Sequence, residues 1–401
     1  LFLWQTGRLL FSDNAGRLAA VLWISLPAVG LGSFVMSTDT PLLLFWSAGL
    51  YCLVRADETF QPNYHWMGLV GICVGLATLS KYAGLYFILP LILWMMTSNF
   101  RKPSQKVKLF GIFFTTAFFA SLPTWLWNYN NGFVTLLHLI ENANFSKSGV
   151  SLVKAPDGSF EGISAFWGAQ FFVFGPVTLL LLVFSLAGLG HGFKHSRLHL
   201  FIWPVLVIMT GQAFLSEANA NWAVTAYPAA TILLGQFITI SRSRFILFLG
   251  KMSLLVNFLL CCTLIAVTAI GNLSVLAPTS DPFRHLRGWA ELAQKTEIHA
   301  RESGARTIIA YNRRSAALLH WYLQDTQFDI VLPRLGTGQG NHYHRTYPMD
   351  ASSPRPFLAL TTQDSVPSHI PISARWQGPT AYSKVQISRR DHRQVWFWLS
   401  D

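Results

Sequence analysis

The sequence predicts a polytopic α-helical membrane protein that ends in a small α/β domain. Of its 401 residues, 52% are hydrophobic and 12% are charged, whereas soluble domains carry about 25% charged residues. Residues 1–271 hold 15 basic and 8 acidic side chains, and the much shorter stretch 272–401 holds 15 basic and 10 acidic ones. The first part is too apolar for a soluble fold. A wholly soluble enzyme, a disordered chain, a coiled coil and a collagen are therefore excluded.

Nine apolar runs fill residues 1–271, and a bilayer core needs about 20 apolar residues per helix. We expect spans at 16–36, 40–55, 64–80, 82–97, 109–127, 165–188, 199–216, 221–240 and 246–271. Residues 1–11 have the character of the end of one more apolar helix, so we expect the sequence to begin inside a larger protein.

The loops between these runs alternate in charge, which predicts the orientation. Twelve of the 15 Lys and Arg residues in 1–271 lie on one side, and the other side holds only Lys81, Lys147 and Lys154. Lys and Arg mark the cytoplasmic side of a membrane protein. Domain 272–401 is then expected outside the membrane, on the periplasmic face. The same asymmetry accounts for much of the net charge of +12, so we expect no nucleic-acid partner.

Strand and helix patterns alternate in the C-terminal domain, which predicts an α/β fold. We expect helices at 281–303 and 314–323, and strands at 306–311, 328–332, 357–361, 382–387 and 394–399. The glycine-rich stretch 336–347 is expected to be a surface loop. Solvated histidines are favoured there over a ligand site at His342 and His344. The four cysteines lie in apolar runs and form no disulfide framework or metal spacing.

Two charged residues stand at the ends of predicted spans on the outer face. Asp39 precedes Pro41 in the motif Ser-Thr-Asp-Thr-Pro, where an N-cap of the following helix is the simplest role. Lys81 stands between two apolar runs. It either snorkels to the interface or holds a lipid-linked phosphate, because an intramembrane cation is a functional candidate by default.

Two further groups of polar residues fall on the same face. His138, Glu141 and Asn142 share one side of a short predicted helix at 133–141, for which a purely interfacial helix is the alternative. Glu217, Asn219 and Asn221 are expected in a tight turn. The alternative interpretation is that they are ordinary polar turn residues beside an aromatic belt. Polar groups that converge at one end of a helix bundle predict a binding site.

Four stretches of the sequence are informative when taken together. They are Ser37–Trp46 (STDTPLLLFW), Gly75–Gly84 (GLATLSKYAG), Pro123–Asn128 (PTWLWN) with Gly132–His138 (GFVTLLH), and Glu217–Trp222 (EANANW) with Tyr227-Pro228. In this order they resemble the bacterial polytopic glycosyltransferases of the GT-C fold. This group is related to protein O-mannosyltransferases and to the lipid A aminoarabinose and galacturonic acid transferases.

The resemblance implies a function. Such enzymes transfer a sugar from a polyprenyl-phosphate donor, at the outer face of the bacterial cytoplasmic (inner) membrane, to a glycolipid, polysaccharide or protein acceptor. It implies that Lys81 contacts the donor phosphate and that Asp39 lines the same cavity. His138, Asn142, Glu217, Asn219 and Asn221 are expected to help bind the substrate. Nothing visible in the sequence requires a metal or another cofactor.

One departure from the family pattern concerns the base. The family takes its catalytic base from an acidic first outer loop, and no Asp or Glu precedes Asp13 here. We therefore expect residues 1–271 to be a transmembrane transferase core without its first span and first outer loop, and the main base to lie upstream of Leu1. A polytopic transporter or lipid flippase with an outer domain is the alternative function. A membrane-anchored binding or sensory protein is a third.

Overall fold

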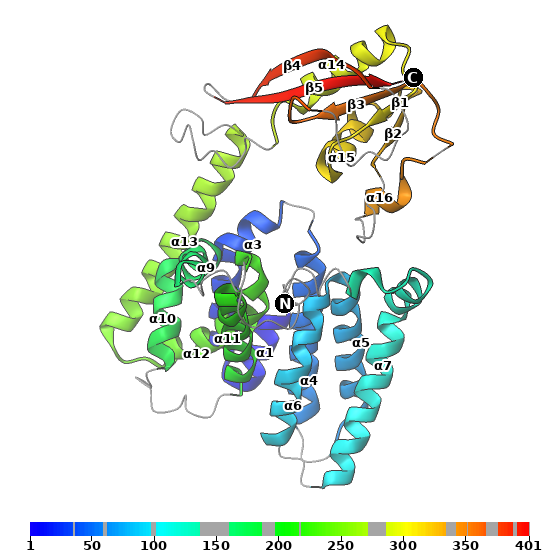
Figure 1. Ribbon diagram of the computed structural model, residues 1–401. Coiled ribbons are helices and arrows are strands. Elements are labelled where there is room, and N and C mark those ends of the chain that lie inside the picture. Colours follow the sequence, from blue (N-terminus) through cyan, green and yellow to red (C-terminus); the bar gives the residue numbers. More distant parts are fainter. Residues whose placement is uncertain are drawn as a thin grey trace. The chain divides into compact units, whose positions relative to one another are not determined.

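The computed structural model describes residues 1–34, 37–58, 62–97, 102–136, 160–186, 197–215, 218–271, 286–333, 342–350, 352–365, 376–387 and 391–400. The chain divides into two compact units, Leu1–Ala266 and Val267–Asp401. The described part of the first unit is helical, and the sheet lies in the second (Figure 1). The predicted combination of an apolar helical part and an α/β part is confirmed.

The apolar runs of the first unit form helices where the sequence predicts them. These helices are α1 (Phe2–Leu10), α2 (Asp13–Ser25), α3 (Pro27–Gly32), α4 (Asp39–Asp57), α5 (Tyr64–Ser80), η1 (Tyr82–Phe87), α6 (Ile88–Thr97), α7 (Pro103–Asn130), α9 (Phe160–Val173), α10 (Pro176–Leu186), α11 (His199–Leu215), η2 (Ala220–Ala226), α12 (Tyr227–Ile240) and α13 (Arg244–Ile270).

Two of the predicted spans are interrupted by local backbone chemistry. Leu26, which precedes Pro27, is extended (φ −60°, ψ 133°) and separates α2 from α3, because a residue before proline avoids the helical region. Gly175 has φ +90° and separates α9 from α10, and the chain bends by 107° between these two helices. A Cβ at Gly175 would overlap the side chain of Asn257 on α13. Glycine is therefore required there both by the positive φ and by this close contact.

Length and apolar character identify three helices in the described residues that are able to cross a membrane. They are α7, the continuous stretch Ala220–Ile240, and α13. The bent pair α9 and α10 is a fourth if it forms one span, and α5, η1 with α6, and α11 are shorter apolar helices. The count of nine spans stays a prediction.

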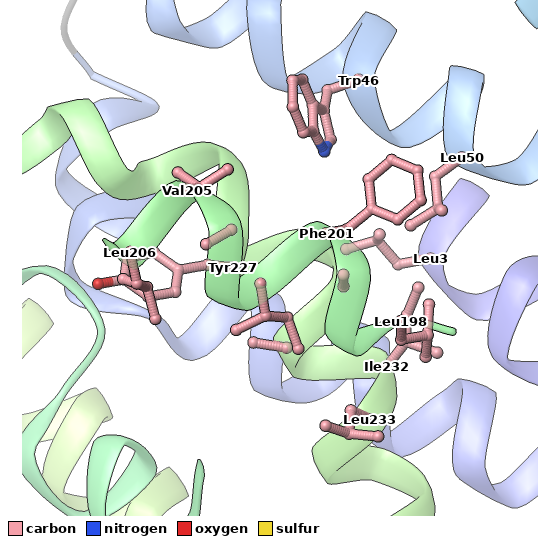
Figure 2. Close-up of a cluster of buried hydrophobic side chains, with 14 of the residues drawn as sticks. Leu3, Trp46, Leu50, Leu198, Phe201, Val205, Leu206, Tyr227, Ile232 and Leu233 are labelled. Atoms are coloured by element: carbon pink, nitrogen blue, oxygen red, sulfur yellow. The ribbon is translucent and has the colours of Figure 1, made fainter. Parts of the chain in front are cut away.

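A cluster of aromatic side chains forms the centre of the helical unit. The rings of Trp46 on α4 and Phe87 on η1 meet edge to face with centroids 4.9 Å apart, and Phe87 meets Phe201 on α11 at 4.8 Å. All three side chains are fully buried. Figure 2 shows Trp46 and Leu50 of α4 beside Phe201. Edge-to-face pairs contribute about 0.5–1.5 kcal/mol beyond their burial, so this cluster fixes α4 against η1 and α11.

An ion pair fixes the other end of α4. Asp57, in the last turn, is buried and pairs with Arg197, which precedes α11. The Arg197 guanidinium also lies 4.5 Å from the ring centroid of Trp94 on α6, and the Trp94 indole N–H donates to the Asp57 carboxylate at 3.3 Å. These contacts therefore hold the C-terminal end of α4, the end opposite to Asp39.

The second unit is a mixed sheet with short helices. Its elements are α14 (Trp289–Glu302), β1 (Thr307–Ile309), α15 (Arg313–Tyr322), β2 (Asp329–Val331), α16 (His342–Thr346), β3 (Phe357–Thr361), β4 (Trp376–Gln386) and β5 (His392–Ser400). The strand order is β2-β1-β3-β5-β4. Strand β1 pairs in parallel with β2 and β3, and β5 pairs antiparallel with β3 and β4.

Three predictions for this unit need correction. Part of the expected loop 336–347 is the short helix α16, in which the Thr346 hydroxyl lies 3.3 Å from His342 Nδ1. The strand expected at 382–387 begins at Trp376 and continues through a bulge. The helix expected from 281 begins at Trp289, and residues 281–285 lie outside the described part of the chain. Local propensity did not reveal the start of β4 because pairing with β5 extends that strand.

Candidate functional site

Lys81 occupies a break between two helices. Helix α5 ends at Ser80, and Lys81 is extended (φ −160°, ψ 137°) before η1 begins at Tyr82. Its backbone N–H still donates to the Ala77 carbonyl at 2.9 Å. Its side chain, 26% exposed, reaches the carboxylate of Asp39, with Nζ 2.6 Å from Oδ1. The ammonium is therefore paired inside the protein and does not simply extend to the interface.

Asp39 does not act as the helix cap that local pattern favours. It is the first residue of α4, and the N-cap residue Thr38 makes no side-chain capping bond. The Ser37 hydroxyl instead accepts the backbone N–H of Asp39 at 3.1 Å. Both carboxylate oxygens are used elsewhere, Oδ1 by Lys81 and Oδ2 by the Asn221 amide at 2.6 Å. Because both oxygens are engaged in these contacts, the carboxylate does not cap the helix end.

Three of the residues singled out in the sequence thus meet at one point. Asp39, Lys81 and Asn221 come from α4, the α5–η1 break and η2, and 182 residues separate Asp39 from Asn221. Asn219 is the exposed N-cap residue of η2. His138, Asn142 and Glu217 lie outside the described residues.

A buried asparagine supports the Lys81 segment. Asn128, in the last turn of α7, has no exposed surface and donates to the Tyr82 hydroxyl at 2.9 Å and to the Thr124 carbonyl at 2.8 Å. Its oxygen accepts the Thr135 hydroxyl at 2.5 Å. Because Tyr82 directly follows Lys81, this network fixes the backbone that carries the ammonium. Sequence analysis used this stretch only for the family resemblance and missed the role of Asn128.

A second buried network supports Asn221. Gln170 on α9 accepts a hydrogen bond from the Tyr227 hydroxyl, and its amide donates to the carbonyls of Phe166 at 3.1 Å and Ala220 at 3.2 Å. Ala220 begins η2, one residue before Asn221. Gln170 therefore fixes the start of η2 against α9. A lone glutamine inside an apolar run is the one signal that the sequence gives for it.

An apolar cavity of about 480 Å³ opens beside this site. Its walls come mainly from α1 to α4, with Trp23, Leu43 and Val224 among the apolar side chains. Asp39 and Asn221 line it, and among the described residues Asp39 is the only acidic or basic side chain in the lining. An apolar space with a charged and an amide side chain in its lining suits an amphiphile with a polar headgroup. The described residues contain no group of three His, Cys, Asp or Glu side chains positioned to hold a metal ion.

Comparison with known proteins gives these features a context. Residues 1–127 match the family described as dolichyl-phosphate-mannose-protein mannosyltransferase. The chain is similar to the lipid A galacturonosyltransferase RgtD of Rhizobium johnstonii, with 26% identity over 367 residues that make up 90% of this chain and 74% of that protein. It also resembles the crystal structure of ArnT from Cupriavidus metallidurans in the apo state. That match has a TM-score of 0.56 and 12% identity, and it covers 99% of this chain and 80% of the other. The chain is a membrane glycosyltransferase of the GT-C fold.

These matches distinguish between the alternative functions considered for the sequence. The family match and the RgtD match are both to glycosyltransferases, so the enzyme is favoured over the transporter, the lipid flippase and the binding or sensory protein. The likeness to ArnT extends over nearly the whole chain and shows the shared fold. The predicted relationship to protein mannosyltransferases and lipid A transferases is confirmed.

Proposed function

We propose that Asp39, Lys81 and Asn221 form the phosphate end of a binding site for a polyprenyl-phosphate-linked sugar, which this glycosyltransferase uses as its donor. The observation that carries the proposal is the pairing of Lys81 with Asp39, with Nζ and Oδ1 2.6 Å apart, because the Asp39 carboxylate also lines an apolar cavity. The cavity offers apolar walls to the lipid chain. The ammonium and the Asn221 amide are hydrogen-bond donors suited to phosphate oxygens.

Lys81 has a clear chemical task in such a reaction. An acceptor hydroxyl oxygen forms a bond to the anomeric carbon of the sugar while the bond from that carbon to the phosphate oxygen breaks. The donor is a phosphodiester with one negative charge, and the released lipid phosphate is a monoester that gains a second. A cation at the phosphate therefore stabilises the transition state more than the ground state.

Asp39 has two tasks in this scheme. In the structure it holds the ammonium in place through Oδ1 and the Asn221 amide through Oδ2. When a donor phosphate binds the Lys81 ammonium, the Asp39 carboxylate loses this partner and becomes free at the edge of the cavity. It is then able to accept the proton of an acceptor hydroxyl or to orient the sugar.

The acceptor that the comparisons favour is a glycolipid of the cell envelope. The match to RgtD, whose name describes transfer to lipid A, extends over 90% of this chain. The match to the protein mannosyltransferase family covers residues 1–127 alone. A lipid A-type glycolipid is therefore proposed ahead of a polysaccharide or a protein.

The transfer is proposed at the outer face of the inner membrane, with residues 272–401 on the periplasmic side. The basis is the clustering of Lys and Arg in alternate loops of the sequence. Single cysteines at Ser104 and Ser352, in a variant without the four native cysteines, test it. A membrane-impermeant thiol reagent should label position 352 in intact spheroplasts and position 104 only after lysis. The reverse pattern contradicts the proposal.

Binding of a polyprenyl phosphate tests the site without knowledge of the sugar. This lipid is the leaving group of the proposed reaction and reports on the phosphate position alone. Lys81→Met should weaken its binding to the protein in detergent micelles by about tenfold or more, since charge-assisted hydrogen bonds contribute about 1.5–3 kcal/mol. Lys81→Arg should retain part of the affinity. Lys102→Met, which removes an exposed lysine at the start of α7, is the charge-matched control and should bind normally. Equal binding by Lys81→Met and Lys102→Met would refute the assignment.

A further inference from the structure

A second hollow lies in the C-terminal unit, in residues that the transfer reaction does not use. Its volume is about 380 Å³. The residues that line it are Trp289, Tyr311, Asn312, Arg314, Thr362, Ile387, Asp391, His392, Arg393 and Gln394. Unlike the cavity beside Asp39, this pocket is lined mainly by polar and charged side chains.

The sheet topology explains why these residues meet. Tyr311 and Asn312 follow β1, and Thr362 follows β3, which runs parallel to β1. Strand β5 is antiparallel to β3, so its first residues reach the same edge of the sheet. The chain leaves β1 through α15 toward β2 on one side, while β3 lies on the other side (Figure 1). Open α/β sheets bind ligands at the carboxyl ends of strands where the connections diverge in this way.

Two guanidinium groups face this pocket, and one of them is partly buried with a nitrogen atom that lacks a hydrogen-bond partner in the described residues. The Arg393 guanidinium lies 3.5 Å from the ring centroid of Trp289. Its Nη1 atom is buried and has no hydrogen-bond partner among the residues that the structure describes. Burial lowers the pKa of Arg393 and the positive charge of Arg314 lowers it further, while the nearby Tyr311 and Asp391 act in the opposite direction. A buried donor left unpaired costs about 1–3 kcal/mol, more when it is charged. An anionic ligand would remove that cost.

The other polar groups of the pocket are compatible with an anion. The Tyr311 phenol stays protonated because burial raises its pKa, so it is available as a donor. Among the described residues Asp391 is the one acidic side chain in the lining, and its carboxylate accepts the backbone N–H of His392 at 2.9 Å. With Arg314 and Arg393 against Asp391, the pocket keeps a net positive charge. Its position at the start of α15 adds the positive end of a helix dipole.

We propose that this pocket binds a phosphomonoester group, carried by a sugar phosphate or by a phosphorylated lipid headgroup. A dianion with three free oxygens is able to engage both guanidinium groups and the Tyr311 hydroxyl together. A neutral sugar would leave both charges unpaired. The inference stands on the C-terminal unit alone and does not require that Lys81 bind the donor.

Isothermal titration calorimetry of the full chain in detergent micelles tests it, with glucose 1-phosphate as the probe and glucose as the uncharged comparison. Glucose 1-phosphate should bind at one site and glucose should not. Arg314→Gln and Arg393→Gln should each weaken binding about tenfold or more. Arg313→Gln is the matched control, because it removes an exposed arginine one position away on the same helix and outside the pocket lining.

The variants separate a lost ligand contact from a lost fold. Arg393 packs on Trp289, so Arg393→Gln is able to act through stability. Arg314 is exposed in the first turn of α15, so its replacement should leave the fold intact. Binding that is equal in wild type, Arg314→Gln and Arg313→Gln, or equal for glucose 1-phosphate and glucose, would overturn the proposal.

A lipid arm identifies the source of the phosphate. The same titration is repeated in nanodiscs of phosphatidylcholine with and without phosphatidic acid. Competition by phosphatidic acid that is lost in Arg314→Gln supports the pocket and assigns it to a lipid headgroup. Unchanged glucose 1-phosphate binding in both nanodiscs supports the pocket and assigns it to a phosphorylated sugar.

Discussion

The Asp39–Lys81 pair should be measurable as a coupling energy. Asp39 is 18% and Lys81 26% exposed, so the energy of the pair should lie between that of an exposed ion pair and that of a buried one. Exposed pairs contribute about 0.2–1 kcal/mol, and removal of one member of a buried pair costs about 3–5 kcal/mol. We expect Asp39→Asn to lower the free energy of unfolding by about 2 kcal/mol, because it leaves the ammonium without its counter-ion.

Asp39→Asn is one variant of a double-mutant cycle. The other two are Lys81→Met and the double variant, and their effects follow from the same geometry. Lys81→Met leaves Asp39 with the Asn221 amide, so its cost should be smaller, at about 1 kcal/mol. The double variant removes both charges and should cost no more than Asp39→Asn alone. The coupling energy is then at least about 1 kcal/mol, well above the roughly 0.3–0.5 kcal/mol scatter of independent sites.

Denaturant titration of the purified protein in mixed micelles, followed by tryptophan fluorescence, measures these energies. The control is a second cycle with Lys102→Met in place of Lys81→Met, which should be additive. Additive effects of Asp39→Asn and Lys81→Met would refute the reasoning, because the two groups would then contribute independently despite their contact.

Three further variants test the supports of the fold. Gln170→Leu should lower the free energy of unfolding by about 1–3 kcal/mol, since it leaves buried polar partners unpaired, and should weaken polyprenyl phosphate binding by displacing Asn221; unchanged binding would exclude the positioning role. Gly175→Ala should destabilise by about 2 kcal/mol or more, because φ is +90° and Asn257 occupies the space of a Cβ, and a normal melting temperature would contradict this. Burial lowers the pKa of His320, so the unfolded chain binds the proton first and stability is lost as pH falls below about 6.5. His320→Gln should therefore reduce the fall in the melting temperature of the C-terminal unit on acidification, and an identical fall in wild type and variant would count against it.

Much of the fold follows from local sequence properties. Apolar runs specify helices at the right places because burial and backbone hydrogen bonding favour helices in such segments. The strands 357–361 and 394–399 are visible as short apolar and aromatic runs, and both are found in the sheet. Positions such as the bend at Gly175 are not visible, because the glycine is needed for its contact with Asn257 on a distant helix.

Among the described residues, the sequence predicted three members of the candidate site but not the contacts between them. The charge asymmetry of the loops placed Asp39, Lys81 and Asn221 on one face, and the structure brings them into contact. Local rules favoured a helix cap for Asp39, and a partner 42 residues away overrode them. The convergence of Arg314 and Arg393 depends on the strand order, which places β5 beside β3 and which no local pattern specifies.

The contact between the Lys81 ammonium and the donor phosphate is the central claim, and solid-state NMR measures it directly. The protein is labelled with ¹⁵N at the lysine side chains, placed in nanodiscs with a polyprenyl phosphate, and examined for ¹⁵N–³¹P dipolar dephasing. One lysine signal should show a nitrogen–phosphorus distance of about 3–4 Å, as a charge-assisted hydrogen bond requires. This signal should be absent in Lys81→Met and present in Lys102→Met. A dephased signal that survives in Lys81→Met, or none in the wild type at saturating lipid, would contradict the account.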